Sequence, residues 1–374
     1  MELNDINFKI RDLWSNANSL YDLKNPYSFS RKDKIKEFLP GLVDLTSLHM
    51  NACKPYNNII SSIYGSDWKK INDIENLPFI PVRSFKNLKL SSIGDEDILK
   101  TLTSSGTSGQ KTSQILLDKE TSVRQSSVLV SLTSHWIGSK RRPMLIFDTK
   151  ASTSSRYAFN ARAAGILGFS QFGRKPLYCL DENMNLDIEQ LEKYIHENKQ
   201  MGIFGFGFTF MLWQSVYKKL KLLGKKIDCG DDSIILHGGG WKKIENQKVS
   251  REKFNQEIID RLGVKKVINY YGMVEQVGSI FFECQEGHFH CPNFSEIIIR
   301  HPITFEPQNY GEPGLIQLLS LLPTSYPGHS ILTEDIGSVL GDDDCPCGLP
   351  GRYFEVHGRQ EQAEARGCSD VANL

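Results

Sequence analysis

Short apolar runs alternate with helical stretches through the middle of this 374-residue chain, and this alternation restricts the fold most strongly. Apolar runs typical of buried strands lie at residues 114–117, 143–148, 203–210, 233–237 and 265–270. Helical patterns lie between them, at residues 118–132, 156–168, 186–198 and 254–262. Strands that alternate with helices predict a mainly parallel sheet with flanking helices. We therefore expect an α/β fold.

Charge and composition exclude several classes of partner. The 44 basic residues balance 44 acidic ones, so there is no electrostatic case for nucleic acid or an anionic membrane as the main partner. The N-terminus lacks the layout of a signal peptide, and the apolar run around residues 201–213 is too short and glycine-rich to span a bilayer. Eight unevenly spaced cysteines fit a reducing compartment. We expect a cytoplasmic protein without a transmembrane segment.

The segment Leu102–Lys111, LTSSGTSGQK, is dense in serine, threonine and glycine. Hydroxyls and backbone N–H groups can surround a polyphosphate, and glycines allow the backbone to approach it closely. It is not a G-x-x-x-x-G-K-S/T loop, because its second glycine comes three residues after the first and Gln110 precedes the lysine. A solvent-exposed linker is the alternative.

Two later predicted strands end in glycine turns, at His237–Trp241 (HGGGW) and at Tyr271–Glu275 (YGMVE). In open α/β sheets ligands bind at the carboxyl ends of strands, so both turns are candidate sites. The run Ile203–Phe210 alternates phenylalanine and glycine, and glycine within a strand often marks close approach of another group. It fits either a slot for an acyl chain or plain core packing.

Cysteine and histidine gather in two turn-like segments, Cys284–Cys291 (CQEGHFHC) and Cys345–Gly348 (CPCG). Three thiolates and one imidazole complete a closed tetrahedral zinc site. We predict that the ligands of a structural Zn²⁺ are Cys284, His290, Cys345 and Cys347, with His288 or Cys291 as substitutes. Unligated buried cysteines are the alternative.

Five glycine-bounded motifs follow one another along the chain. They are Thr103–Lys111, His237–Trp241, Tyr271–Glu275, Thr333–Gly337 and Gly358–Arg359. Their order resembles the core motifs of adenylate-forming enzymes, which include acyl- and aryl-CoA ligases, over about residues 75–367. The stretches SSGTSGQ, YGMVEQVGS and GR…RGCS are most similar to the acyl-protein synthetase (LuxE) family. The resemblance implies an adenylate-forming N-terminal domain with the C-terminal domain reduced to a short tail.

The resemblance also implies site residues. The β- and γ-phosphates of ATP would lie against Thr103, Ser104, Ser105, Gly106, Thr107, Ser108 and Gly109. The rest of the nucleotide site would comprise Gly238, Gly239, Tyr271, Gly272, Glu275, Asp335 and Arg359. In it, adenine would lie on the glycines at 238–239 and stack on Tyr271, while Asp335 and Arg359 would reach the ribose. Glu275 would hold Mg²⁺, which prefers carboxylates together with phosphate oxygens.

The C-terminus departs from the larger ligases. Residues 358–367 resemble the hinge after which those enzymes continue into a mobile domain, whereas seven residues follow here. The late lysine of that domain then has no counterpart, and Lys111 is a candidate substitute. Cys368 follows the hinge, and a thiolate is a good acceptor for the acyl group of an acyl-adenylate. In similar synthetases a cysteine at this place is acylated, and an idle terminal thiol is the alternative.

Four parts are thus expected: an N-terminal helical region (1–75), an α/β core for nucleotide and acyl group (76–290), a β subdomain (291–357), and a hinge remnant with a tail (358–374). The resemblance implies ATP-dependent activation of a carboxylic acid, such as a fatty acid, to acyl-AMP. The acyl group would pass to Cys368 and on to a protein acceptor such as an acyl reductase. The alternatives are a ligase that uses the thiol of coenzyme A or a carrier protein, and a non-catalytic nucleotide-binding regulatory subunit.

Overall fold

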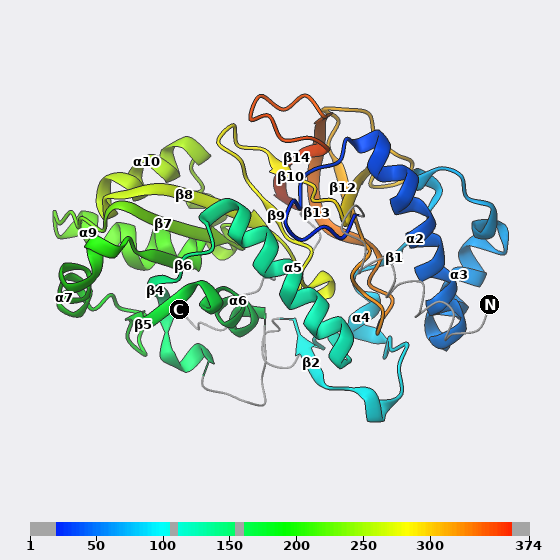
Figure 1. Ribbon diagram of the computed structural model, residues 1–374, viewed down its shortest axis with the longest axis horizontal. Coiled ribbons are helices and arrows are strands. Elements are labelled where there is room, and N and C mark those ends of the chain that lie inside the picture. The colour runs from blue at the N-terminus through cyan, green and yellow to red at the C-terminus, as the bar shows by residue number, and fades with distance from the viewer. Residues whose placement is uncertain (1–19, 105–110, 154–160, 361–374) are drawn as a thin grey trace. The chain divides into compact units, whose positions relative to one another are not determined.

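The computed structural model describes residues 20–104, 111–153 and 161–360 (Figure 1). These residues form two compact units. The first unit comprises residues 20–104, 111–135 and 272–360, and the second comprises residues 136–153 and 161–271. Within the described ranges, no helix combines the length and the apolar character needed to cross a membrane.

The second unit is built on parallel strands in the order β5–β4–β6–β7–β8. The strands are β4 (Arg142–Thr149), β5 (Gly173–Leu180), β6 (Phe204–Phe208), β7 (Gly230–Gly238) and β8 (Val264–Tyr271). The helices that flank them (Figure 1) are α6 (Ala161–Phe169), α7 (Ile188–Asn198), α8 (Thr209–Met211), α9 (Lys218–Leu222) and α10 (Arg251–Leu262). Shorter turns are η4 (Lys150–Thr153), η5 (Ser170–Phe172), η6 (Lys199–Met201), η8 (Lys242–Gln247) and the π-helix η7 (Leu212–Tyr217). The predicted α/β fold is confirmed.

Strand β6 carries the alternating phenylalanines and glycines, and all five of its residues are buried. A Cβ atom at Gly205 or Gly207 would lie 2.9 Å from the side chain of Phe147 on the neighbouring strand β4. On the other face, Phe206 packs on Phe169 of α6, with 4.9 Å between ring centroids. The glycines therefore make room for a neighbouring aromatic side chain, and the alternation serves core packing.

The first unit contains an antiparallel sheet in the order β10–β14–β13–β12–β11, and β1 pairs in parallel with β13. The strands of the first unit, in this sheet and outside it, are β1 (Ile80–Pro81), β2 (Lys100–Thr103), β3 (Gln114–Leu117), β9 (Phe281–Phe282), β10 (Phe289–His290), β11 (Ser295–Arg300), β12 (Gly314–Ser320), β13 (Ser330–Asp342) and β14 (Arg352–Arg359). Its helices are α2 (Arg31–Ala52), α3 (Lys54–Tyr64), α4 (Ser84–Asn87) and α5 (Lys119–Ile137), of which the last two residues belong to the second unit. Shorter turns are η1 (Asp67–Lys70), η2 (Ile74–Asn76), η3 (Asp95–Asp97) and η9 (Val274–Gln276).

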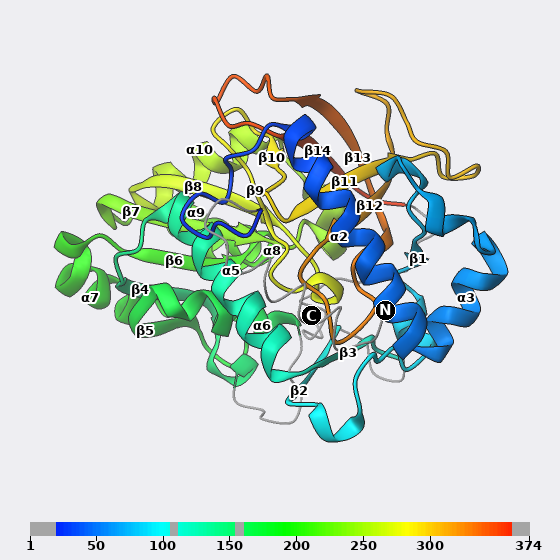
Figure 2. The ribbon, with the colours of Figure 1, turned by 45° about the vertical axis from the view of Figure 1, so that its right-hand side comes forward.

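Helix α2 lies along this sheet (Figure 2), and a buried ion pair joins it to β11. The helix begins where the Ser30 hydroxyl accepts a hydrogen bond from the Asp33 backbone N–H. One turn on, Lys34 Nζ lies 3.0 Å from a carboxylate oxygen of Glu296 and donates to the carbonyl of Ser295. A buried charge is tolerated only when it is paired and hydrogen-bonded, as this one is.

Strands β2 and β3 form an antiparallel hairpin. Its end is closed by two hydrogen bonds: the Ser104 N–H donates to the Ser113 carbonyl, and the Ser113 N–H donates to the Ser104 hydroxyl. The segment rich in serine, threonine and glycine therefore connects two paired strands. Its central residues, 105–110, lie outside the described residues.

Candidate functional site

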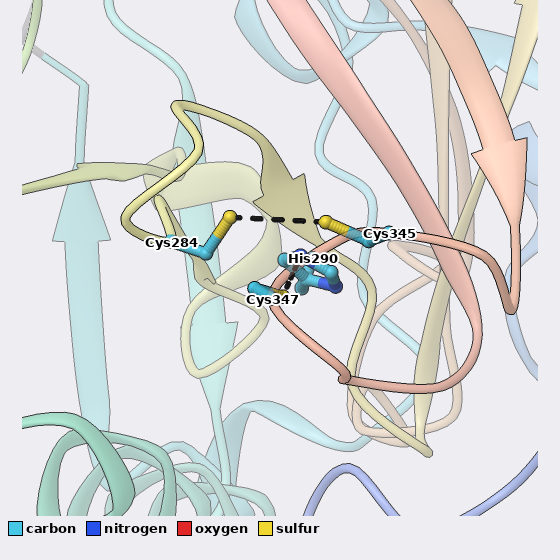
Figure 3. Close-up of side chains that lie close together, drawn as sticks. All are labelled: Cys284, His290, Cys345 and Cys347. Carbon is cyan, nitrogen blue, oxygen red and sulfur yellow. Dashed lines mark hydrogen bonds between the residues drawn. The ribbon is translucent and has the colours of Figure 1, made fainter.

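Four predicted metal ligands lie together in the first unit (Figure 3). The ligand atoms of Cys284, His290, Cys345 and Cys347 all lie within 4.8 Å of one another. The Sγ atoms of Cys284 and Cys345 are 4.0 Å apart, and Cys347 Sγ is 3.3 Å from His290 Nε2. A tetrahedral zinc ion would hold its sulfur and nitrogen ligands about 3.6–3.8 Å apart. The cluster is thus close to the dimensions of such a site.

Two similar turns present the thiols. In each turn a cysteine carbonyl accepts a hydrogen bond from a glycine N–H three residues on, at 3.0 Å between Gly287 and Cys284 and at 2.9 Å between Gly348 and Cys345. Both glycines have positive φ, +87° and +85°, which other residues rarely adopt. The β10–β14 pairing joins the two halves, because His290 lies opposite Tyr353 across these strands.

The protonation of these groups suits a metal. Burial raises the pKa of Cys284 and raises the pKa of Cys345 to about 12, so both are thiols in the absence of a cation. Burial also lowers the pKa of His290 to about 4, which keeps its imidazole neutral, as a ligand must be. Its Nδ1 atom is buried with no hydrogen-bond partner among the described residues. A bound divalent cation would stabilise the thiolates.

The two substitute ligands lie differently. His288 Nδ1 is 3.3 Å from Cys345 Sγ, so this half-buried imidazole borders the cluster. Cys291 is buried and lies outside the group of four. Its pKa is raised mainly by burial and, to a smaller extent, by the negative charge of Glu296. The structure thus gathers the four residues first chosen and keeps His288 within reach of one of them.

Glu275 is a buried carboxyl group in the short turn η9 of the first unit. Burial raises its pKa, while hydrogen bonding, first of all with the Ser113 side chain, and then the positive charges of Lys86 and Arg359 act in the opposite direction. Its turn is held in place by Gln276, whose Nε2 donates to the carbonyls of Leu318 and Gly328 at 3.0 and 2.8 Å. A buried acid with a raised pKa favours a further cation nearby, so this carboxylate suits Mg²⁺.

Asp335 and Arg359 are cross-strand partners of β13 and β14 in the first unit. Arg359 Nε donates to a carboxylate oxygen of Asp335 at 3.3 Å, and the arginine side chain is 36% exposed. Because residues that face each other across antiparallel strands lie close together, the pairing places a carboxylate acceptor beside a guanidinium donor. Such a pair can bind a diol.

In the second unit, the glycine turn after β7 and the end of β8 lie side by side, since Gly238 pairs with Tyr270. A Cβ atom at Gly238 would lie 2.7 Å from the Tyr270 ring. Gly239 is exposed and has a φ of +82°. The Tyr270 ring therefore fills the space beside Gly238, whereas Gly239 leaves exposed backbone, and half-buried Tyr271 and Gly272 follow Tyr270 in the chain. That arrangement can accept a flat ring.

His237 lies in strand β7 just before this turn. The sequence showed it only as part of a glycine motif and did not indicate that it is a core residue. It is buried, its Nδ1 lies 2.9 Å from the Thr209 hydroxyl, and its ring packs 4.7 Å from the ring of Phe254. Burial lowers its pKa to about 3. Nothing in a single sequence distinguishes such a core histidine from an exposed one.

His237 makes a pH-dependent contribution to stability. The unfolded chain binds a proton at this histidine below about pH 6.5, whereas the folded chain does not until about pH 3, so stability is lost as the pH falls. At pH 5 this costs about 2 kcal/mol. We expect the unfolding free energy of wild type to fall between pH 7.5 and pH 5 by about that much more than that of His237→Asn, in urea titrations followed by tryptophan fluorescence. Parallel pH profiles would contradict this account.

The remaining predicted residues are divided. Thr103 ends the first strand of the hairpin, Ser104 follows it, both are half-buried, and Lys111 is exposed. The loop residues Ser105, Gly106, Thr107, Ser108 and Gly109 lie outside the described residues, as does Cys368. Their roles stay predictions.

Comparison with known proteins decides the family. The family model of acyl-protein synthetases, LuxE, matches residues 12–374. The chain belongs to this family. Two similar proteins are long-chain-fatty-acid–luciferin-component ligases. That of Aliivibrio fischeri is 26% identical over 356 residues, which cover 93% of this chain and 90% of that protein. That of Vibrio harveyi is 24% identical over 308 residues, which cover 80% and 78%. The prediction of a ligase is confirmed.

Solved structures confirm the fold of this LuxE family member. An open conformation of 2-hydroxyisobutyryl-CoA ligase, in complex with 2-HIB-AMP and CoA, matches with a TM-score of 0.66 and 12% identity, over 90% of this chain and 77% of that one. The same ligase in the postadenylation state with R3-HIB-AMP matches with a TM-score of 0.64 and 13% identity, over 90% and 69%. Family and fold together support activation of an acid by adenylation.

Proposed function

We propose that this chain activates a long-chain fatty acid with ATP and transfers the acyl group through its own cysteine to a protein acceptor. The first step joins a carboxylate oxygen of the acid to the α-phosphorus of ATP and releases pyrophosphate, which leaves acyl-AMP. The names of the two ligases support the choice of acid. The match to the acyl-protein synthetase family is the observation that carries the adenylation step, and buried Glu275 offers a carboxylate for the metal cation.

Proposed nucleotide residues are found in both units. In the first unit, Glu275 would hold the Mg²⁺ of Mg·ATP, and the Asp335–Arg359 pair would bind the ribose hydroxyls. In the second unit, the exposed backbone at Gly239, which follows Gly238, and Tyr271 would accept adenine. Mg²⁺, when bound, offsets charge on the phosphates. The loop at the tip of the β2–β3 hairpin would wrap the β- and γ-phosphates.

The second step would use Cys368. Its thiolate attacks the acyl carbonyl carbon, the bond to AMP breaks, and a thioester forms while the thiol proton goes to solvent. Acyl-adenylates are mixed anhydrides, so AMP is a good leaving group. A nucleophile of the acceptor protein, such as the thiol of an acyl reductase, would then take the acyl group from the thioester.

Acyl transfer can be followed directly on the protein. The purified chain incubated with Mg·ATP and labelled fatty acid should acquire label that hydroxylamine removes, as it does from thioesters. Cys368→Ala should lose all protein-bound label and retain acyl-AMP formation, because the cysteine acts after adenylation. Cys347→Ala is unsuitable as a control, since it is a proposed metal ligand, so Cys179→Ala, a buried thiol of the second unit, serves instead. Label retained in Cys368→Ala would contradict transfer through this residue.

We propose further that Cys284, His290, Cys345 and Cys347 bind a structural Zn²⁺ in the first unit. The support is a donor set of three sulfurs and one nitrogen with separations near those of a tetrahedron. Four protein ligands leave no open position, so the ion would have a structural role. It would fasten the turn after β9 to the turn between β13 and β14.

A further inference from the structure

The adenylation step still lacks an assigned cationic side chain for the phosphates, and helix α4 of the first unit carries a lysine. The segment before α4 is fixed to β13: β1 pairs with residues 331–332 of that strand, and the Val82 N–H donates to the Leu332 carbonyl at 2.9 Å. Arg83 then forms an ion pair with Glu334, the residue before Asp335. Helix α4 also contacts β3, the strand that follows the proposed phosphate loop. Helix α4 is therefore fixed next to strands β13 and β3, which carry or adjoin the proposed nucleotide residues of this unit.

Core residues beside α4 lie close to the turn that carries Glu275. The ring of Phe85 packs edge-on against that of Tyr326, with 6.1 Å between centroids. Tyr326 and Glu275 both crowd Gly328: a Cβ atom there would lie 2.2 Å from the tyrosine ring and 2.9 Å from the Glu275 carbonyl oxygen. Phe85, Tyr326 and Glu275 are all buried, so this path is rigid core rather than mobile surface.

Lys86 follows Phe85 in α4 and is half-buried. Its positive charge acts on the Glu275 carboxyl, as does that of Arg359. Glu275, Asp335, Arg359 and Lys86 thus place two carboxylates and two cations in one unit, on η9, β13, β14 and α4. The Asp335 carboxylate already accepts from Arg359, whereas Lys86 adds a compact ammonium that suits a phosphate oxygen.

We propose that Lys86 is a catalytic residue whose ammonium contacts the phosphates of ATP beside the Mg²⁺ held by Glu275. The inference rests on the proposed adenylation. In that reaction the bond between the α-phosphorus and the bridging oxygen breaks, and negative charge grows on the departing pyrophosphate. An ammonium that is fixed before the reaction stabilises this charge without reorganisation. The ammonium neither gains nor loses a proton in the step. Lys86 would thereby supply the cation for which Lys111 was the sequence-based candidate.

The test compares neutral variants in fatty-acid-dependent ATP–pyrophosphate exchange with saturating Mg²⁺. Lys86→Met and Lys86→Gln should lower kcat/KM for ATP by about a hundredfold, with an unchanged KM for the fatty acid. Lys89→Met is the matched control, because Lys89 lies three residues on, is 56% exposed and pairs with Asp95 at 2.5 Å. It should exchange pyrophosphate at the wild-type rate. If a Lys86 variant instead lost activity because its fold was disrupted, its Tm and its KM values for ATP and for the fatty acid would all change.

The outcomes separate this inference from the function on which it rests. Wild type without exchange would remove the proposed adenylation itself. Active wild type with equally active Lys86→Met and Lys86→Gln would overturn the role of Lys86 alone, and loss of exchange in Lys111→Met would then point to Lys111. The two neutral variants differ in polarity, so the exchange rate of the variant that retains the wild-type Tm decides whether Lys86 has this role. Direct binding of Mg·ATP, measured by equilibrium dialysis, should weaken in the same variant.

Discussion

Replacing Glu275 with glutamine should lower fatty-acid-dependent ATP–pyrophosphate exchange at least about a hundredfold. The side chain keeps its size and remains buried, but it no longer offers an ionised oxygen to Mg²⁺. Removal of the charge also relieves a carboxyl group whose pKa burial raises, so the variant should be as stable as wild type or more so. In measurements on the same preparation, activity should therefore fall while Tm stays the same or rises.

Glu296 provides the matched control, since it is a second buried glutamate of the first unit. Burial alone would raise its pKa, but the charges of Lys34 and Arg352 lower it to about 2. Glu296→Gln leaves the buried ammonium of Lys34 without its partner and should destabilise the protein by about 3–5 kcal/mol. The Mg²⁺ concentration for half-maximal exchange should not change. A shift in the Mg²⁺ requirement of Glu296→Gln, or none in Glu275→Gln, would contradict the assignment.

Cys345→Ser should abolish stoichiometric zinc and unfold the β13–β14 end of the first unit. Apparent binding free energies of structural zinc are about 10–16 kcal/mol in small domains. Loss of the ion should therefore lower the stability of the protein by more than an ordinary core substitution does. We expect about one zinc ion per chain in wild type by elemental analysis. In the variant, loss of zinc should be accompanied by faster proteolysis of residues 284–290 and 343–351.

Cys291→Ser is the control for this loss. Cys291 is buried next in sequence to His290, yet it lies outside the four gathered ligands. The substitution should lower stability and leave the zinc content unchanged. Wild type without zinc above background would remove the proposed site, and zinc loss in Cys291→Ser would show that the ligand set is different.

Local patterns of apolar residues in the sequence predicted the fold of the second unit. Strands β4, β6, β7 and β8 lie where apolar runs ended in turns, and the parallel sheet follows from the helices between them. The same patterns could not choose between core packing and an acyl slot for the phenylalanine–glycine strand. That choice depends on Phe147, which reaches the glycines from a neighbouring strand 58 positions before Gly205.

The candidate site was predictable only where chemistry lies within a motif. His288 and His290 are two residues apart, so strand periodicity points both to the same face and cannot rank them as ligands. Lys86 carried no signal in the sequence, because the position of helix α4 depends on the pairing of β1 with β13 about 250 residues later. Long-range pairing of this kind is what the structure adds.

The central claim is that the chain forms an acyl-adenylate, and fatty-acid-dependent exchange of labelled pyrophosphate into ATP tests it most directly. The folded, zinc-analysed protein should catalyse this exchange in the presence of Mg²⁺ and a long-chain fatty acid, and should not do so when either is omitted. No exchange with any carboxylic acid tried, from protein that is folded by its Tm, would contradict the account.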